Sequence, residues 1–440
     1  MIYTLKMSMF LTALSICAQT ASAQTQNSYF SMSREGRIHN RDGLSGLKIN
    51  LRDRDIYSPK SVTFARDGTK FYIHSLEGGK TVVYSYPQFE KLKVIKHQFS
   101  EKDAYLFRNE TTVFNYPYYQ NLTDSQKNIF MGKPVESALS HGGRYLWITY
   151  YRRSYDPSAQ SPSALAIVDT TTDEIVRVMP TGPIPKYVTI SADNKMAAIV
   201  QWGDNTVSLM DISSQDARDF HYTSHVAIGE QLSQADLFGT NRDSTCGYCL
   251  RGAVFSADSR YLLVAKMSRG GGVAGIDVSR QKYLGSINSF APTPRHLVLD
   301  PSGEALYVSS NTAGVISRVS FNTVLDELLR AAGKNLNVSL PGLQKVDLGS
   351  GARTIDLTPD GRTLFVALNS SQVLSAIDAA TLTPLAEIAV DPYPVGLATS
   401  PDGRVVLVTS QGVRGQGGNS VDIVIFERVD LDSVVSPDLN

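Results

Sequence analysis

The feature that most limits the fold of this chain is a short hairpin pattern that returns along nearly its whole length. The clearest copy, residues 355–366, reads IDLTPDGRTLFV. Each copy has an alternating apolar run, a tight turn of Asp, Asn, Ser and Gly, and a second apolar run, as a two-stranded hairpin requires. Further copies begin at Val62, Ser137, Val188, Ala253, Leu297 and Leu397. The sequence therefore predicts seven hairpins.

The spacing of these hairpins indicates the architecture. The residues at their turns are Asp67, Gly142, Asp193, Asp258, Ser302, Asp360 and Asp402, which lie 42 to 75 residues apart. A repeat of about 40 to 45 residues with four short strands is typical of a β-propeller blade, which must stack on neighbouring blades to bury its faces. Insertions account for the longer spacings. We therefore predict an all-β fold, a seven-bladed β-propeller.

The two ends of the propeller predict how it closes. The last blade has two hairpin strands within 397–410 and a third at 420–427, so a fourth strand is missing. Residues 46–51, GLKINL, resemble the fourth strands of later blades and precede the first hairpin. We expect this N-terminal strand to complete the last blade and remove an open sheet edge. The propeller should span 46–428, with a loose polar arm at 24–45 and a tail at 429–440.

The first residues have the pattern of a secretory signal peptide. Lys6 is followed by an apolar stretch at 7–17 and by small residues at 21–23, which predicts a signal at 1–23 cleaved after Ala23. The stretch is too short to span a bilayer, and no later segment reaches about 18 apolar residues. We expect an exported monomer without a membrane span, either periplasmic or secreted to the cell surface.

The charge balance limits the partners. The chain has 42 basic and 42 acidic side chains, so its formal net charge is zero. No overall field then attracts a nucleic acid or a membrane, and nucleic-acid binding is only weakly supported. Any recognition by charge must come from a local arrangement of side chains.

Loop length predicts which face of the propeller binds. The turns between first and second strands of the blades emerge on one face, here called the tight-turn face, and all seven are short. The loops between second and third strands, and the crossings between blades, emerge on the opposite, long-loop face. The long segments on that face are 99–133, rich in Phe and Tyr, 150–163, 231–249, 267–272 and 412–419. Long loops on a rigid scaffold usually carry binding, so we place the site there. The periodicity also predicts a helix at 323–332, with Asn322 as its N-cap.

A second repeated position is cationic. Seven residues before each turn residue, five of the seven repeats carry a basic side chain, namely Lys60, Lys186, Arg251, Arg295 and Arg353. That position begins the innermost strand of each blade, so the repeat should set these five residues, the cationic ring, around one mouth of the channel. Each could pair within its own blade. Alternatively, the ring could clamp carboxylate or phosphate oxygens. Arg152 and Arg269 on nearby loops could extend the patch.

Other chemistry is sparse. Cys246 and Cys249 are the two cysteines after the predicted signal, and a disulfide between them is favoured over redox exchange or zinc binding. His296, beside Arg295, and Glu136 are acid–base candidates, with His296 also a candidate ligand contact. No catalytic serine motif, phosphate loop or metal-ligand cluster stands out. We expect no cofactor and no metal, and assign no catalytic residue.

The repeats resemble those of a known family. Phrases such as SPDGRVVLVTS and TPDGRTLFVALNSSQVLSAIDAATLTPLAEI are similar to the YVTN repeats of exported, YncE-like bacterial β-propellers. The resemblance covers 58–428, and it implies a cell-envelope protein without assigning an activity. Our leading interpretation is a non-enzymatic binding propeller for an anionic small molecule, polymer or protein partner. The alternatives are a lactone hydrolase of the 6-phosphogluconolactonase type, with His296 and Glu136 transferring protons, and a purely structural scaffold.

Overall fold

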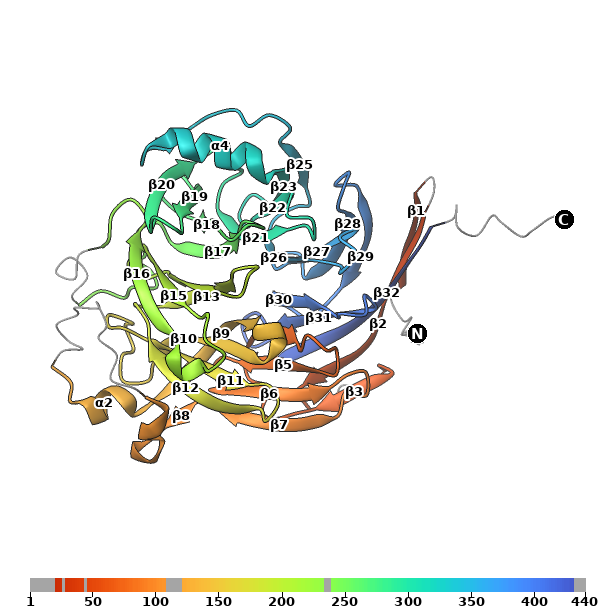
Figure 1. Cartoon of the computed structure of the whole chain (residues 1–440). Coiled ribbons are helices and arrows are strands. Elements are labelled where there is room, and N and C mark those ends of the chain that lie inside the picture. The colour runs from red at the N-terminus through yellow and green to blue at the C-terminus, as the bar shows by residue number, and fades with distance from the viewer. Residues whose placement is uncertain (1–19, 26–27, 43–45, 108–120, 233–238, 431–440) are drawn as a thin grey trace, which may run out of the picture.

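The computed structural model describes residues 20–25, 28–42, 46–107, 121–232 and 239–430. These form seven small sheets arranged as blades around a central axis (Figure 1). Each innermost strand contacts the innermost strands of the two neighbouring blades, and β30 (Pro394–Thr399) of blade seven contacts β4 (Pro59–Phe64) of blade one. The ring is therefore closed, which confirms the predicted seven-bladed β-propeller.

The strands of each blade run outward from the axis in chain order. Blade one comprises β4, β5 (Lys70–Ser75), β6 (Lys80–Ser85) and β7 (Lys91–Lys96). Blade two comprises β9 (Phe130–Ser140), β10 (Tyr145–Arg153), β11 (Ala164–Asp169) and β12 (Glu174–Pro180), with β8 (Gln98–Phe99) beside β9. Blade three comprises β13 (Pro185–Ile190), β14 (Met196–Gln201), β15 (Thr206–Asp211) and β16 (His221–Ala227). Blade four comprises β17 (Leu250–Phe255), β18 (Tyr261–Lys266), β19 (Gly272–Asp277) and β20 (Lys282–Ile287), with β24 (Asn335–Leu336) beside β20. Blade five comprises β21 (Pro294–Leu299), β22 (Ala305–Ser310), β23 (Val315–Ser320) and β25 (Gln344–Asp347). Blade six comprises β26 (Ala352–Leu357), β27 (Thr363–Leu368), β28 (Val373–Asp378) and β29 (Pro384–Ala389), and blade seven contains β30, β31 (Val405–Ser410) and β32 (Ser420–Asp430).

The tight turns are held by the side chains that the repeat conserves within this chain. In blade four, Ser256 Oγ donates a hydrogen bond to Asp258 Oδ1 at 2.5 Å and accepts one from the Tyr261 N–H at 3.0 Å. Blades six and seven repeat these contacts with Thr358 and Ser400. Short polar side chains that bond to the local backbone favour turns, so the hairpin is specified locally.

The hydrophobic core lies between the blades. Phe71 and Ile73 of blade one, for example, share one buried cluster with Leu407 and Ile423 of blade seven. Apolar side chains from facing sheets fill each gap between blades in this way, so no blade buries its own faces alone.

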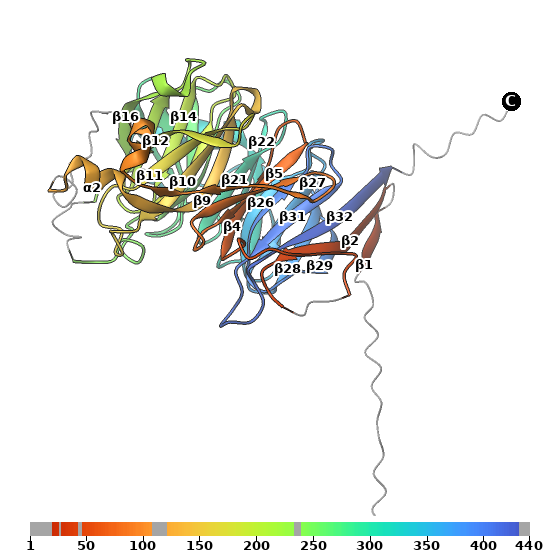
Figure 2. The same cartoon turned by 90° about the horizontal axis from the view of Figure 1, so that it is seen from below.

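The last blade is closed by an N-terminal strand, as predicted, but by a different one. β2 (Ser28–His39) pairs antiparallel with β32, while β3 (Ile49–Arg52), from the segment predicted to close the blade, pairs parallel with the far side of β2. Figure 2 shows β32, β2 and β1 (Thr20–Thr25) side by side. The prediction of a loose arm at 24–45 is therefore wrong for the residues of β2, and the last blade includes residues before 46.

The composition of β2 explains why it was missed. Its buried apolar residues are only Phe30, Met32 and Ile38, and it also buries Arg37. Arg37 forms ion pairs with Asp391 at 2.9 Å and with Asp422 at 2.7 Å, which allow it to lie in the interior. In the sequence, however, a charged residue at this position indicates an exposed segment. Gly36 also has a role, since a Cβ there would lie 2.3 Å from Ile49 Cβ and would exclude β3.

Short helices lie in the insertions and, in blade two, at the tight turn. The helices are η1 (Glu101–Leu106), α2 (Asp124–Asn128), η2 (His141–Gly143), η3 (Ala217–Asp219) and α4 (Phe321–Ala331). The helix predicted at 323–332 is α4, which starts two residues earlier with Ser320 as its N-cap, because Phe321 is buried and extends the apolar face. None of the helices in the described parts of the chain is both long and apolar enough to cross a membrane.

The aromatic insertion at 99–133 packs against blade two. Phe99, Phe107 and Phe130 form ring contacts with one another at centroid distances of 5.1 to 6.2 Å. Phe99 and Phe130 also contact Tyr150 of β10. The described part of the insertion is thus part of the blade's packing, while its residues 108–120 lie outside the described ranges.

Candidate functional site

A β-bulge near the start of the innermost strand sets the geometry of the channel. In blade one, Pro59 pairs with Ser75 and Ser61 with His74, so Lys60 is an extra residue between two ladder pairs. The same shift occurs near the start of the innermost strand in blades three to seven. A bulge leaves one residue unpaired and changes the direction of its side chain, so consecutive residues can both face the channel.

The cationic ring is built from these bulges. Lys186, Arg251, Arg295 and Arg353 lie within the bulge of blades three, four, five and six, as Lys60 does in blade one. Lys60, Arg251, Arg295 and Arg353 are only 6 to 9% exposed. Arg251, Arg295 and Arg353 all act electrostatically on Lys60, and Arg251 and Arg295 act on Lys186. The structure therefore brings the five predicted residues together.

Two ring residues have clear partners from neighbouring segments. Lys186 Nζ forms an ion pair with Asp243 at 2.8 Å and lies 4.4 Å from the ring centroid of Tyr151. Arg353 Nη1 donates to the Tyr393 hydroxyl at 3.4 Å. These two residues therefore pair within the protein, as the first of the two interpretations of the ring predicts.

The other three have weaker partners or none. Arg251 Nη1 donates to the Lys186 carbonyl at 3.4 Å, and Arg295 Nη1 donates to the Met267 sulfur at 3.5 Å. For Lys60 Nζ, the described residues supply neither a hydrogen bond nor an ion pair. Sulfur is a weak acceptor and a carbonyl oxygen carries no full charge, so among the described residues no carboxylate is paired with any of these three buried cations.

The electrostatics of the ring reflect this shortage of negative charge. Burial, followed by repulsion from Arg353, Arg251 and Arg295, holds the pKa of Lys60 well below its usual range. Burial and repulsion from Arg251 lower the pKa of Lys186 to about 7, despite the ion pair with Asp243. Glu136, which directly follows the register position of blade two, opposes these effects on Lys60 through its carboxylate, and burial nevertheless raises the pKa of Glu136. An added anion would reduce the repulsion between the cations.

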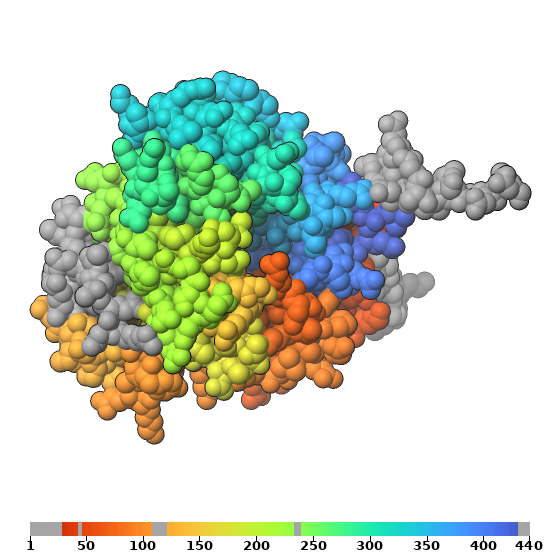
Figure 3. Space-filling view, in the orientation of Figure 1, coloured from red at the N-terminus to blue at the C-terminus, as the bar shows by residue number. Residues whose placement is uncertain are grey.

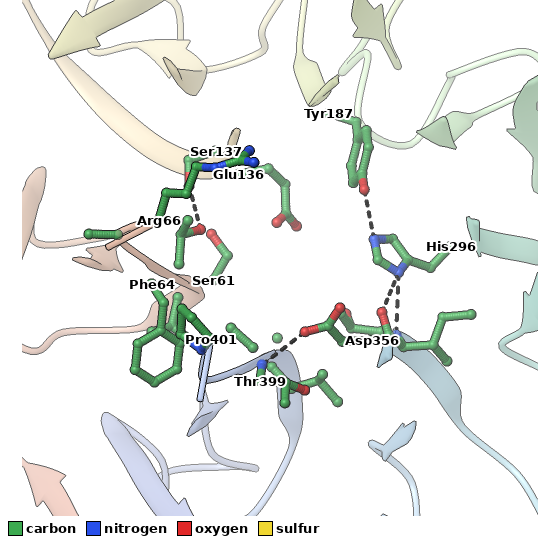
Figure 4. Close-up of a pocket in the computed structure, with 18 residues that line it drawn as sticks. Ser61, Phe64, Arg66, Glu136, Ser137, Tyr187, His296, Asp356, Thr399 and Pro401 are labelled. Atoms are coloured by element: carbon green, nitrogen blue, oxygen red, sulfur yellow. Dashed lines mark hydrogen bonds between the residues drawn. The ribbon is translucent and has the colours of Figure 1, made fainter. Parts of the chain in front are cut away.

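A cavity of about 390 Å³ lies next to the ring, lined by residues adjacent to the ring cations but by none of the five cations themselves (Figure 4). Its polar lining comes largely from the residues that directly follow the ring positions. The bulges therefore place two successive residues of each bulged strand at the channel, the ring residue and the residue after it. These residues are Ser61, Glu136, Tyr187, His296 and Thr354. At its other end the cavity reaches Arg66 and Pro401 beside the tight turns.

The cavity therefore lies toward the tight-turn face rather than the long-loop face on which we expected the site. Figure 3, which views the tight-turn face, shows a hollow near its centre. The physical reason is that segments on the long-loop side fold back over the ring, where Asp243, Tyr151 and Tyr393 contact its cations. The tight turns are too short to cover the channel in the same way.

The two acid–base candidates have different environments. His296 is held through both ring nitrogens, with Nε2 3.0 Å from the Tyr187 hydroxyl and Nδ1 3.0 Å from the Ile355 carbonyl. Burial lowers the pKa of His296 to about 4, so the imidazole is neutral at physiological pH. The Glu136 carboxylate instead points into the open centre of the cavity.

The two outlying arginines do not join the site. Arg152 donates to the Pro157 carbonyl of its own loop, and Arg269 lies 5.6 Å from the ring centroid of Tyr248. Neither contributes to the lining of the cavity. Both side chains have a local partner on the long-loop side, which is why they do not extend the ring.

The cysteines lie close to the ring in sequence. Cys246 and Cys249 form a disulfide, with their Cα atoms 4.8 Å apart, in the segment that leads into β17 and Arg251. Both are less than 9% exposed. Within the described ranges, no group of three or more His, Cys, Asp and Glu side chains is arranged to hold a metal ion.

Sequence reasoning missed Asp356 and Tyr187. Both line the cavity, and burial raises the pKa of Asp356 to about 6. A signal for Asp356 does exist, since it lies four residues before its turn residue, where the other six repeats carry only Thr, Ala or Val. Tyr187 shares the register of Glu136 and His296, six residues before the turn, and comparison along that register would have found it.

Comparison with solved structures finds the fold at low sequence identity. A structure of hydrazine synthase from Kuenenia stuttgartiensis matches with a TM-score of 0.56 and 13% identity, covering 84% of this chain and 96% of that chain. The β-propeller domain of Cps50 (Swd1) from Myceliophteria thermophila matches with a TM-score of 0.56 and 11% identity, over the same shares of the two chains. No protein-family model matches the sequence, and no curated protein is similar to it. At such identities these neighbours establish a β-propeller and nothing about its ligand.

Proposed function

We propose that this protein is a non-catalytic binding propeller that holds an anionic ligand in its central channel, against the cationic ring. The observation that carries the proposal is the group of buried bulge cations, of which Lys60, Arg251 and Arg295 lack a paired carboxylate among the described residues. Arginine side chains hold carboxylate and phosphate oxygens through two parallel hydrogen bonds, and they do so best away from water. Such a ligand would supply the missing negative charge.

Binding is a better match to the cavity than hydrolysis. A lactone hydrolase would use His296 with Glu136 for proton transfer, but both nitrogens of His296 already have partners within the protein. A general base must be within hydrogen-bond reach of the proton that it removes. A polymer or protein partner could use the same cations by inserting a terminal acidic group, because a cavity of about 390 Å³ accepts only a small group.

We also propose that the protein acts at the cell envelope. The signal-like segment at 1–23 and the resemblance of the repeats to exported YVTN, YncE-like propellers support this placement. The Cys246–Cys249 disulfide adds support, because disulfides persist in oxidising compartments.

The test of the anion site is thermal melting against phosphate, sulfate, acetate and citrate at constant ionic strength. A ligand that binds only the folded state stabilises it by about 2.7 kcal/mol at a hundred times its Kd. We expect at least one anion to raise the Tm in this concentration-dependent way. The variant Arg295→Gln/Arg353→Gln should lose the shift.

The control carries the same change in charge at exposed sites. Arg260 and Arg280 lie exposed on blade four, away from the cavity lining, so Arg260→Gln/Arg280→Gln should keep the shift. If every anion leaves the Tm unchanged, or if both double variants respond equally, the anion site is wrong and a structural scaffold becomes the better interpretation.

A further inference from the structure

The cavity has an acidic part that the anion site does not explain. The carboxylates of Glu136, from blade two, and Asp356, from blade six, both point into its open centre (Figure 4). Both carboxylates also act on the phenol of Tyr187. Burial is the largest cause of the raised pKa of Tyr187, followed by the charges of Glu136 and Asp356. Two separate blades therefore bring two carboxylates to one space.

Neither carboxylate has a cationic partner of its own. Asp356 is fixed by backbone groups, because Oδ2 accepts the Thr399 N–H at 2.8 Å and Oδ1 accepts the Leu357 N–H at 3.1 Å. Among the described residues, no basic side chain lies within 4 Å of either carboxylate. Both residues are half-buried, and a carboxylate partly removed from water without a cation is unfavourable, so a positively charged ligand atom would stabilise both groups.

The acidic part of the cavity lies next to the cationic ring, although none of the five ring residues is among those that line the cavity; the basic residue in its lining is Arg66, beside the tight turns. Glu136 lies at the boundary, because Arg251, Lys60, Arg295 and Arg353 all act on it electrostatically. For Asp356 the causes of the raised pKa are burial, opposed by hydrogen bonds from Thr399 and Leu357, and no basic side chain of the described residues is among them. Lys60, only 8% exposed and without a partner for its ammonium group among the described residues, is one of the cations that act on Glu136. A simple anion would satisfy the ring and leave Asp356 unmatched.

We propose that the channel binds a small zwitterion, with its carboxylate or phosphate against the cationic ring and its protonated amine between Glu136 and Asp356. This inference rests on the anion site proposed above. An ammonium group has three N–H donors and can serve both carboxylates, whereas an anion without an amine would meet Asp356 as a like charge. The amine therefore determines specificity, and the ring supplies the attraction for the acid.

The experiment is isothermal titration with ω-amino acids from glycine to 6-aminohexanoate, each compared with the alkanoate of equal chain length, acetate to hexanoate. The series covers different spacings between acid and amine. A hydrogen bond to a charged group contributes about 1.5 to 3 kcal/mol, so at the best length the amine should tighten binding by about tenfold or more. In Asp356→Asn and in Glu136→Gln, that advantage should fall below about threefold, with alkanoate binding kept or improved.

Glu387→Gln, an exposed carboxylate on the outer strand of blade six, is the matched control and should keep the full advantage of the amine. Thermal melting of each variant shows whether it is folded, and Glu136→Gln carries the test if Asp356→Asn does not fold. If amino acids and alkanoates bind equally at every length, the zwitterion is wrong while the anion site stands. If the amine helps but neither variant reduces its effect, the proposed position of the amine is wrong. If neither series binds, both proposals are wrong.

Discussion

At the scale of single residues, three of the ring cations, Lys60, Arg251 and Arg295, owe their positions to the surrounding fold rather than to a carboxylate partner among the described residues. Arg295 is 9% exposed, and its guanidinium contacts a methionine sulfur rather than a carboxylate. Burial and repulsion from Arg353 and Arg251 hold the pKa of Arg295 well below its usual range. Such a residue lowers the stability of the free protein, and its retention makes sense if it meets a ligand.

The variant Arg295→Met should therefore stabilise the free protein while weakening anion binding. Methionine keeps most of the apolar stem and removes one of several repelling charges, so we expect a gain of about 1 to 2 kcal/mol in the free energy of unfolding at low salt. Urea denaturation without added anions measures it. Arg280→Met, at an exposed side chain, should change stability by less than about 0.5 kcal/mol. A loss of stability in Arg295→Met would contradict this account.

Asp356 predicts a specific pH dependence. Burial raises its pKa from 3.8 to about 6, so the folded state holds a proton that the unfolded state has already lost between these two values. Its contribution to stability is complete below about pH 4 and is lost as the pH rises to about 6, which corresponds to about 3 kcal/mol. Asp356→Asn should remove this loss.

The measurement is the difference in unfolding free energy between Asp356→Asn and the wild type at pH 4, 5, 6 and 7. It should shift in favour of the variant by about 3 kcal/mol from pH 4 to pH 7. Glu387→Gln, exposed on the same blade, should show a nearly constant difference. A constant difference for Asp356→Asn as well would mean that its carboxyl titrates normally.

At the scale of elements, the strand that closes the ring depends on a buried ion-pair network. Arg37 of β2 bridges Asp391 and Asp422, and Asp422 of β32 is fully buried. The N-terminal strand and the last blade are therefore joined by charge as well as by backbone hydrogen bonds. Loss of Arg37 would be costly, because Asp422 would be buried without a cation, whereas Asp391 would keep its ion pair with Arg41 at 2.8 Å.

Arg37→Ala should accordingly be severely destabilising. Removing one partner of a buried pair costs about 3 to 5 kcal/mol, and here the fully buried Asp422 loses its cation while Asp391 keeps only Arg41. Lys48→Ala offers a contrast, since Lys48 pairs with Glu35 while its side chain is 81% exposed, and its loss should cost less than about 0.5 kcal/mol. Urea denaturation measures the loss of unfolding free energy in each variant. Equal losses in the two variants would show that the closing strand does not depend on Arg37.

At the scale of the whole molecule, export and closure involve neighbouring residues. Cleavage after Ala23 would remove four of the six residues of β1, leaving β2 intact beside β32. The ring should then remain closed in the mature protein. We expect N-terminal sequencing of the protein from the envelope fraction of a bacterial host to begin at Gln24.

A variant that lacks residues 2–23 should stay in the cytoplasm and still fold, because the strands that close blade seven are all retained. Recovery of the exported fraction with Met1 at its terminus, or of the full-length chain only from the cytoplasm, would contradict the signal peptide. Misfolding of the truncated variant would instead show that β1 is needed for closure.

The sequence alone was sufficient for the number of blades and for the membership of the cationic ring. Both depend on local patterns, since each hairpin is specified by its own alternation and by the turn chemistry of residues such as Ser256 and Asp258. A position repeated in register must reappear at the same level of a symmetric ring. Lys60 and Arg353 could therefore be grouped although they lie far apart in the chain.

Tertiary structure decided the rest, for reasons that no local pattern contains. The closing strand is β2 because the burial of Arg37 becomes favourable only beside Asp391 and Asp422, which come from the other end of the chain. The cavity lies toward the tight-turn face because bulges redirect consecutive side chains into the channel while residues from the long-loop side cover the ring. Glu136 and Asp356 become one acidic site only because closure of the propeller brings blades two and six to a shared axis.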